Sequence, residues 1–127
     1  MKYYINKTIK ADIETATNKV TEELQKEGFG IVTQFDVNQA LKEKLNVDFR
    51  PYRIMGACNP AFALKSILAE DKIGTILPCN VMLQELENGV EIAIINPQSM
   101  VSDIDNEEMQ AIAEQINEKM LRVILNL

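Results

Sequence analysis

The chain has 127 residues, the length of one ordinary domain, so we expect residues 1–127 to form a single domain around one core. Hydrophobic residues make up 46% of the chain and charged residues 25%, proportions that exclude a disordered, collagenous or disulfide-framework protein. The net charge is −6, which argues against binding to nucleic acid or to an anionic membrane surface.

The sequence contains no histidine and two cysteines. Without histidine, one chain cannot form a Ser-His-Asp or Cys-His catalytic site or a His-ligated metal site. Two cysteines cannot complete a four-thiolate zinc site unless a second subunit supplies two more, so we expect no metal and no other cofactor. The first residues contain no apolar segment of the length that a signal peptide or a membrane span needs. We therefore expect a cytoplasmic protein with both cysteines as thiols.

The first third of the chain reads as strand, helix, strand and short helix. Polar residues alternate with β-branched or aromatic ones over residues 3–9, which predicts a strand. Asp12 is a natural N-cap, and apolar residues at helical spacing follow it until Gly28. Residues 30–37 are predicted to form a strand, and Asn38 to cap a short helix that reaches Leu45.

The middle of the chain opens with a loop over residues 46–51 and a third strand over residues 52–57. Asn59-Pro60 then begins a helix, with asparagine at the cap and proline at the first helical position. Residues 75–87 have strand composition, interrupted by a bend or bulge at Pro78.

Asn88-Gly89 is the strongest turn signal in the chain and predicts a tight hairpin that pairs residues 81–87 with residues 90–96. A cap within residues 103–106 begins the last long helix. This order is not the regular alternation of a doubly wound sheet, so we predict an α+β fold with an antiparallel sheet and two long helices on one face. The apolar character of Ile92, Ile94 and Ile95 favours a second subunit or a ligand on the other face.

Two similar strings place Cys-Asn where a predicted strand meets a turn. They are Gly56-Ala57-Cys58-Asn59-Pro60 and Leu77-Pro78-Cys79-Asn80-Val81. A helix N-terminus stabilises a thiolate, so Cys58, beside the predicted cap Asn59, is the better candidate for a reactive sulfur. The alternative is that both cysteines are small buried residues that pack at strand ends.

Residues 48–53 place two guanidinium groups and two aromatic rings in a loop of an otherwise acidic protein, in the string Asp48-Phe49-Arg50-Pro51-Tyr52-Arg53. Arginine beside aromatic faces suits a carboxylate, a phosphate or a planar ligand. Alternatively, nearby carboxylates neutralise these arginines and the aromatic rings fix the loop to the core.

The strings Arg50-Pro51-Tyr52-Arg53, Cys58-Asn59-Pro60 and Leu77-Pro78-Cys79-Asn80-Val81 resemble the domain of unknown function family numbered three hundred and two. The resemblance covers nearly the whole chain. It implies a TATA-binding-protein-like fold, with a strand, a helix, four strands and a helix, and a homodimer that would cover the open sheet face. It implies no activity, and DNA binding does not follow from the fold, because this acidic chain lacks a basic surface.

Our first hypothesis is a homodimeric domain that binds a small anionic or planar ligand between residues 50–60 and the Cys79-Asn80 bend. Arg50 and Arg53 would hold an anionic group, and Tyr52 would pack against the ligand. Asn59 and Asn80 would orient it, because asparagine both donates and accepts hydrogen bonds.

The alternatives use the same segments differently. Cys58 and Cys79 could serve a thiol enzyme or a redox sensor, as a dithiol pair or as separate nucleophiles. A dimer could also share a four-cysteine metal site, or act only by contacting another protein. The sequence leaves these readings, and with them the question of catalysis, open.

Overall fold

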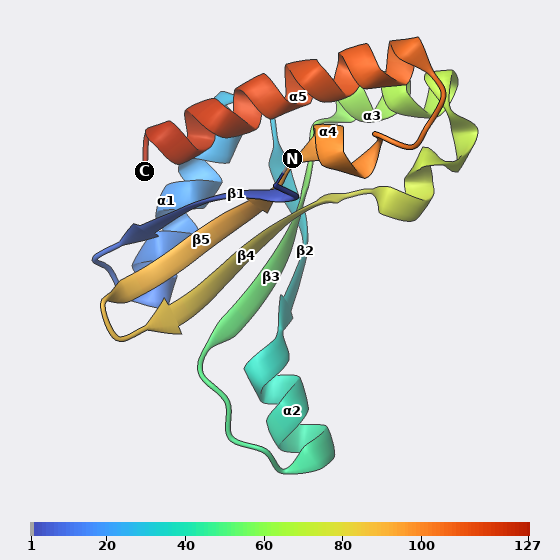
Figure 1. Ribbon diagram of the computed structural model, residues 1–127. Coiled ribbons are helices and arrows are strands. Elements are labelled where there is room, and N and C mark those ends of the chain that lie inside the picture. Colours follow the sequence, from blue (N-terminus) through green and yellow to red (C-terminus); the bar gives the residue numbers. More distant parts are fainter. Residues whose placement is uncertain (1) are drawn as a thin grey trace.

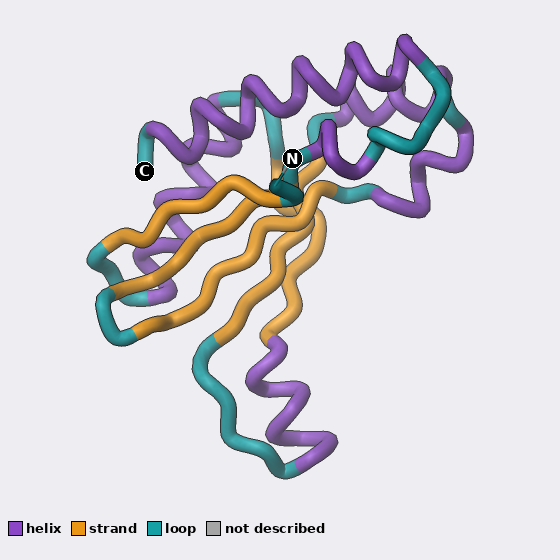
Figure 2. Tube along the Cα trace, in the orientation of Figure 1, coloured by secondary structure: helices purple, strands orange, loops and turns teal. Residues whose placement is uncertain are grey.

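Five strands form one open antiparallel sheet in the order β1-β5-β4-β3-β2 in the computed structural model, which describes residues 2–127 (Figures 1 and 2). The predicted α+β class and antiparallel sheet are confirmed. The elements are, in chain order, β1 Tyr4–Ile9, α1 Ile13–Lys26, β2 Gly30–Asp36, α2 Val37–Leu45, β3 Tyr52–Cys58, α3 Pro60–Ala69, the 3-10 helix η1 Asp71–Ile76, β4 Cys79–Leu86, β5 Gly89–Ile95, α4 Pro97–Met100 and α5 Glu107–Leu125.

The predicted hairpin is present in the middle of the sheet, but its two turn residues are Glu87 and Asn88 and not Asn88 and Gly89, so its register differs from the predicted one. β4 and β5 pair from Leu86 opposite Gly89 to Val81 opposite Ile94. Gly89 has a φ of 138°, and a Cβ there would overlap the carbonyl of Ile9 in the neighbouring strand. Glycine is therefore needed both for the turn and for the close approach of β1.

Three predicted caps begin the three longer helices after β1. The side-chain oxygens of Asp12, Asn59 and Asn106 each accept a hydrogen bond from the backbone N–H three residues later, at the starts of α1, α3 and α5. These bonds satisfy N–H groups that have no partner within the helix. Of the helices within residues 2–127, none is both long and apolar enough to cross a membrane.

One face of the sheet lies under the helices. α1 packs against β2, β4 and β5, while α5 packs against β1, α1 and α3. Ile92 and Ile94 are fully buried in this core. The expectation that they favour a cover on the other face is therefore wrong, since of the three isoleucines only Ile95 alternates to the open side.

Two predicted segments differ in detail. The short helix begins after Asp36 and not after Asn38, because the Asn38 side chain accepts a hydrogen bond from the backbone of Tyr52 instead of capping. Residues 71–76 form a 3-10 helix, so β4 begins only at Cys79, after the cis Leu77-Pro78 peptide bond.

α2 and the loop after it, residues 37–51, project from the end of the sheet as an arm (Figure 1). None of the α2 residues, all of which the structure describes, is buried. Leu45 is 66% exposed, and Val47 and Phe49 are also exposed. The arm thus carries apolar side chains that the described chain does not cover.

Candidate functional site

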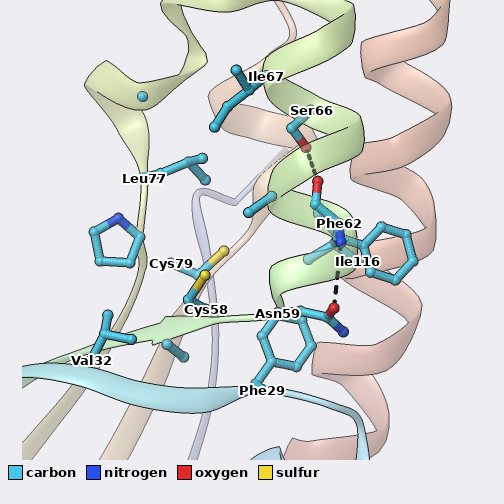
Figure 3. Close-up of a pocket in the computed structure, with 14 residues that line it drawn as sticks. Phe29, Val32, Cys58, Asn59, Phe62, Ser66, Ile67, Leu77, Cys79 and Ile116 are labelled. Atoms are coloured by element: carbon cyan, nitrogen blue, oxygen red, sulfur yellow. Dashed lines mark hydrogen bonds between the residues drawn. The ribbon is translucent and has the colours of Figure 1, made fainter.

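The structure separates the seven predicted ligand-binding residues into three places. Arg53 lies under the sheet, on the side of α1. Arg50, Tyr52 and Asn80 lie at or beside the open face, and Cys58, Asn59 and Cys79 line a groove beside α3. Figure 3 shows this groove. The seven residues therefore do not form one pocket.

Arg53 is part of the internal structure and does not reach the open face. Its Nε donates to Asp36 Oδ1 at 2.7 Å, and its two terminal nitrogens donate to Thr17 Oγ1 and Glu14 Oε1, each at 3.0 Å. The hydrogen bond that Arg53 donates to Asp36 is the main reason that the pKa of Arg53 lies above its ordinary value. These bonds join β2, β3 and α1, so the proposed role of Arg53 in holding an anionic ligand is wrong.

A hollow of about 350 Å³ lies on the open face of the sheet. We call it the sheet-face hollow; Tyr4, Tyr52, Asn80, Met82, Gln84, Glu91 and Ala93 are among its lining residues. Arg50 reaches its edge, where Nε donates to Gln84 Oε1 at 2.8 Å. Gln84 in turn donates to Glu91 at 2.6 Å. The hollow is thus lined partly by polar side chains that hold one another in place.

The second hollow lies between α3, the ends of β2 and β3, and the segment that leads into β4. We call it the α3 groove; its volume is also about 350 Å³. Its walls are mainly apolar side chains and the two thiols, with Phe29, Cys58, Phe62, Leu77, Cys79 and Ile116 among the lining residues. Figure 3 shows these side chains around the open space.

Both polar side chains that line the α3 groove are already engaged within the protein. Asn59 Oδ1 accepts from the N–H of Phe62, and its Nδ2 donates to the carbonyl of Glu27 at 3.3 Å. Ser66 Oγ donates to the carbonyl of Phe62 at 2.7 Å. Asn59 is therefore a structural residue, because it caps α3 and joins it to the end of α1.

The contact of Asn59 with the end of α1 depends on Gly28. This glycine has a φ of 87°, and its missing Cβ would stand 2.8 Å from Asn59 Nδ2. A side chain at this position would be strained and would push the asparagine away. The sequence signal for Gly28, a helix end, was correct but did not reveal this second role.

Cys58 and Cys79 are brought together at the floor of the groove, where both remain thiols (Figure 3). Cys58 ends β3 and is half-buried, whereas Cys79 begins β4 and is 8% exposed. Burial raises the pKa of Cys79 from 9.0 to about 11, and the proximity of Cys58 adds to the effect. Cys79 is thus a protonated, weak nucleophile at neutral pH.

Metal ligation has little support in this part of the chain. Within residues 2–127, no three cysteine, aspartate or glutamate side chains cluster as metal ligands. The two thiols of the α3 groove form a pair without a third such group in the described residues. A closed thiolate site would therefore need ligands from another chain.

Sequence reasoning missed the apolar walls of the groove. Phe29 and Ile116 come from segments far apart in the chain, and in the sequence each looks like any core residue. It also missed Gln84 and Glu91, which alternation places on one face of adjacent strands. The predicted turn at Asn88-Gly89 would place Glu91 opposite Leu86, so the pair becomes apparent only in the observed register.

Comparison with known proteins agrees with the fold. A family model described as "Domain of unknown function DUF302" matches residues 5–127. A solved structure of an uncharacterized conserved protein DUF302 from Bacillus stearothermophilus is 24% identical and superposes with a TM-score of 0.92. The match covers 99% of this chain and 98% of that one. No curated protein matches this chain.

Proposed function

Since this chain belongs to the DUF302 family, whose description assigns no activity, we propose from the α3 groove that the protein binds a small ligand with a planar, apolar body. The observation that carries the proposal is a hollow of about 350 Å³ walled mainly by carbon and sulfur. Small-molecule sites are typically concave, largely apolar and of at least about 300 Å³.

The polar groups of the groove favour this ligand class. The side chains of Asn59 and Ser66 are both bonded to backbone groups, which leaves little hydrogen-bonding capacity in the groove for a polar ligand. A polar group placed against the wall would lose its hydrogen bonds to water without replacement. Burial of apolar surface is therefore the main source of affinity.

An anionic group on the ligand would be best accommodated at the edge where α3 meets α5. Lys65 and Lys119 hold their ammonium groups over the Phe62 ring, at 5.2 and 5.8 Å from its centre. Phe62 also lines the groove. A carboxylate that reaches this edge would meet positive charge, whereas the arginines expected from the sequence lie elsewhere.

The test is titration with the neutral fluorescent probe N-phenyl-1-naphthylamine. Ala63 lines the α3 groove and Ala93 lines the sheet-face hollow, so Ala63→Phe and Ala93→Phe are a matched pair that fill one hollow each. We expect Ala63→Phe to weaken probe binding about tenfold or more and Ala93→Phe to leave it within about twofold. Equal affinity in folded samples of both variants would overturn the proposal.

A second candidate function is self-association through the arm, and the observation that favours it is the exposure of Leu45, Val47 and Phe49. The arm has a net charge of +1, while the whole chain carries −6, so its charge complements the remainder of a second copy. Its charged residues are Lys42, Glu43, Lys44, Asp48 and Arg50.

Self-association is tested by sedimentation equilibrium. We expect a dimer for the native chain and dissociation in Leu45→Ser, because a polar side chain at the centre of an apolar contact removes its driving force. Leu68→Ser on α3, which is more exposed than Leu45 but lies outside the arm, is the control. A monomeric native chain would refute this candidate.

A further inference from the structure

We propose that Cys58 and Cys79 form a dithiol–disulfide exchange site for small organic disulfides, in which Cys58 attacks and Cys79 resolves. This activity goes beyond ligand binding, since it needs the two sulfurs of the groove and not a resident ligand.

The register of the sheet places the backbones of the two cysteines close together, and both side chains line the α3 groove (Figure 3). Cys79 is directly opposite Ala57, the residue before Cys58. Opposite Cα atoms in antiparallel strands are about 5 Å apart and one residue adds about 3.4 Å along the strand, so the Cα atoms of the two cysteines are roughly 6 Å apart. This lies inside the range of about 4.4–6.8 Å usual for disulfides.

The surroundings of the two sulfurs assign their roles. Cys58 is half-buried, faces the open groove and directly precedes the cap of the ten-residue helix α3. Cys79 is buried, and its raised pKa keeps it protonated at neutral pH. The first attack on an incoming disulfide therefore falls to the more accessible sulfur, while the second benefits from the high local concentration of an adjacent thiol.

The reaction with a disulfide RSSR balances without any further reagent. The Cys58 thiolate attacks one sulfur, forms the Cys58–SR bond and releases RS⁻, which takes up the proton that Cys58 gave to solvent. Cys79 then loses its proton and attacks the Cys58 sulfur, and the second RS⁻ leaves as RSH. The protein dithiol is oxidised to a disulfide and RSSR is reduced to two thiols.

The apolar lining of the groove favours a neutral disulfide over a monovalent metal ion held by the two thiolates. A disulfide is neutral, whereas two thiolates around a single monovalent soft cation leave a net negative charge. An apolar wall penalises that charge strongly. Ser66 donates its hydroxyl to the backbone, and Asn59 has one of its two amide N–H groups bonded to Glu27, so the lining offers few donors to offset the charge.

Intact-mass spectrometry of the reduced protein, incubated with 2-hydroxyethyl disulfide near neutral pH, tests the proposal. We expect the native chain to lose the mass of two hydrogens, and Cys79→Ser to stop at the adduct with one half of the reagent. Cys58→Ser should react at least about tenfold more slowly, since only the buried, protonated thiol remains. Thermal melting checks that all three proteins are folded.

The outcomes separate this inference from ligand binding. Equal reactivity of the two single variants would overturn the assigned roles, and a native chain that stops at the adduct would overturn the exchange site. Either result would leave probe binding in the α3 groove untouched. Conversely, loss of probe selectivity between Ala63→Phe and Ala93→Phe would leave the exchange reaction standing, because its readout is mass alone.

Discussion

The sheet-face hollow and the α3 groove have the same volume, about 350 Å³, but opposite construction. The sheet-face hollow is built from alternate residues of adjacent strands, and a chain of side-chain hydrogen bonds through Gln84 and Glu91 holds its floor. The α3 groove lies where strands end and α3 begins. Its walls are apolar apart from Asn59 and Ser66, whose side chains are hydrogen-bonded to backbone carbonyls.

This difference shows that volume alone does not identify a binding site. A ligand on the sheet face would have to compete with water and with an existing hydrogen-bond network. A ligand in the α3 groove would replace poorly bonded water at an apolar wall, which favours binding. Four measurements test this contrast between the two hollows.

The largest expected effect concerns Arg53, which lies beneath the strands that carry both hollows. In Arg53→Met the carboxylate of Asp36, 19% exposed, loses its partner at 2.7 Å. We expect the free energy of unfolding to fall by about 3 kcal/mol, measured by urea denaturation. Arg122→Met, which removes an exposed arginine from its pair with Glu27, should have a much smaller effect on the free energy of unfolding. Similar losses in both variants would mean that water screens the Arg53–Asp36 pair as strongly as it screens the Arg122–Glu27 pair.

The second test asks whether the Cys79 thiol, at the floor of the α3 groove, is shielded from water. A thiol with a folded-state pKa near 11 stays protonated after its unfolded counterpart has ionised near pH 9. The contribution of the protonated Cys79 thiol to the free energy of unfolding is therefore fully present below pH 9. It falls by about 2 kcal/mol as the pH rises towards 11. The urea midpoint of the reduced native chain should fall more between these pH values than that of Cys79→Ala. If the urea midpoints of the two proteins changed equally with pH, the Cys79 thiol would not be shielded from water.

The third test concerns the support of the groove. Asn59→Ala removes the cap of α3 and the bond to the carbonyl of Glu27, and should cost about 1 kcal/mol. Asn59→Asp retains the capping oxygen but loses the donor, so it should recover part of the stability. Probe affinity should weaken with the loss of the donor, because the bond to Glu27 holds one edge of the groove. An unchanged probe affinity in both variants would show that the cap of α3 does not contribute to binding in the groove.

The smallest effect is expected at the sheet face. Arg50 is an exposed residue that lies over the Phe49 ring and donates to Gln84. Arg50→Ala should change the free energy of unfolding by no more than about 0.5 kcal/mol and leave probe binding in the α3 groove unaltered. A clear change in probe affinity would show that the two hollows are coupled, and the contrast between them would then be incomplete.

The fold was largely predictable, because its signals are local. The hairpin signal at Asn88-Gly89 and the caps Asp12, Asn59 and Asn106 each act within a few residues of sequence, where propensity decides. The turn itself lies one position earlier than predicted, at Glu87 and Asn88. The cap expected at Asn38 failed because a distant backbone N–H, that of Tyr52, competes for its side chain. Local signals fail where tertiary contacts offer a better partner.

The candidate site was predictable only in part. Tyr52 and Arg53 are neighbours in a strand, and the strand period of two places them on opposite faces, so the sequence already argued against their sharing a pocket. The nearness of Cys58 and Cys79 depends on the β3–β4 register, which no local pattern specifies. The residues that form the apolar walls of the α3 groove carry no polar or reactive group that would distinguish them in the sequence.

The hydrogen bond between Asn59 and the end of α1 has a consequence for how this scaffold could diversify. The apolar side chains of α3 that face the groove are held by packing, whereas the joint at Gly28 and Asn59 also depends on a positive φ and a specific hydrogen bond. Directed evolution could therefore exchange the lining of the groove for a new ligand while the joint keeps the helix in place. A library randomised at Ala63 and Ile67, with Gly28 and Asn59 kept, would exploit that separation.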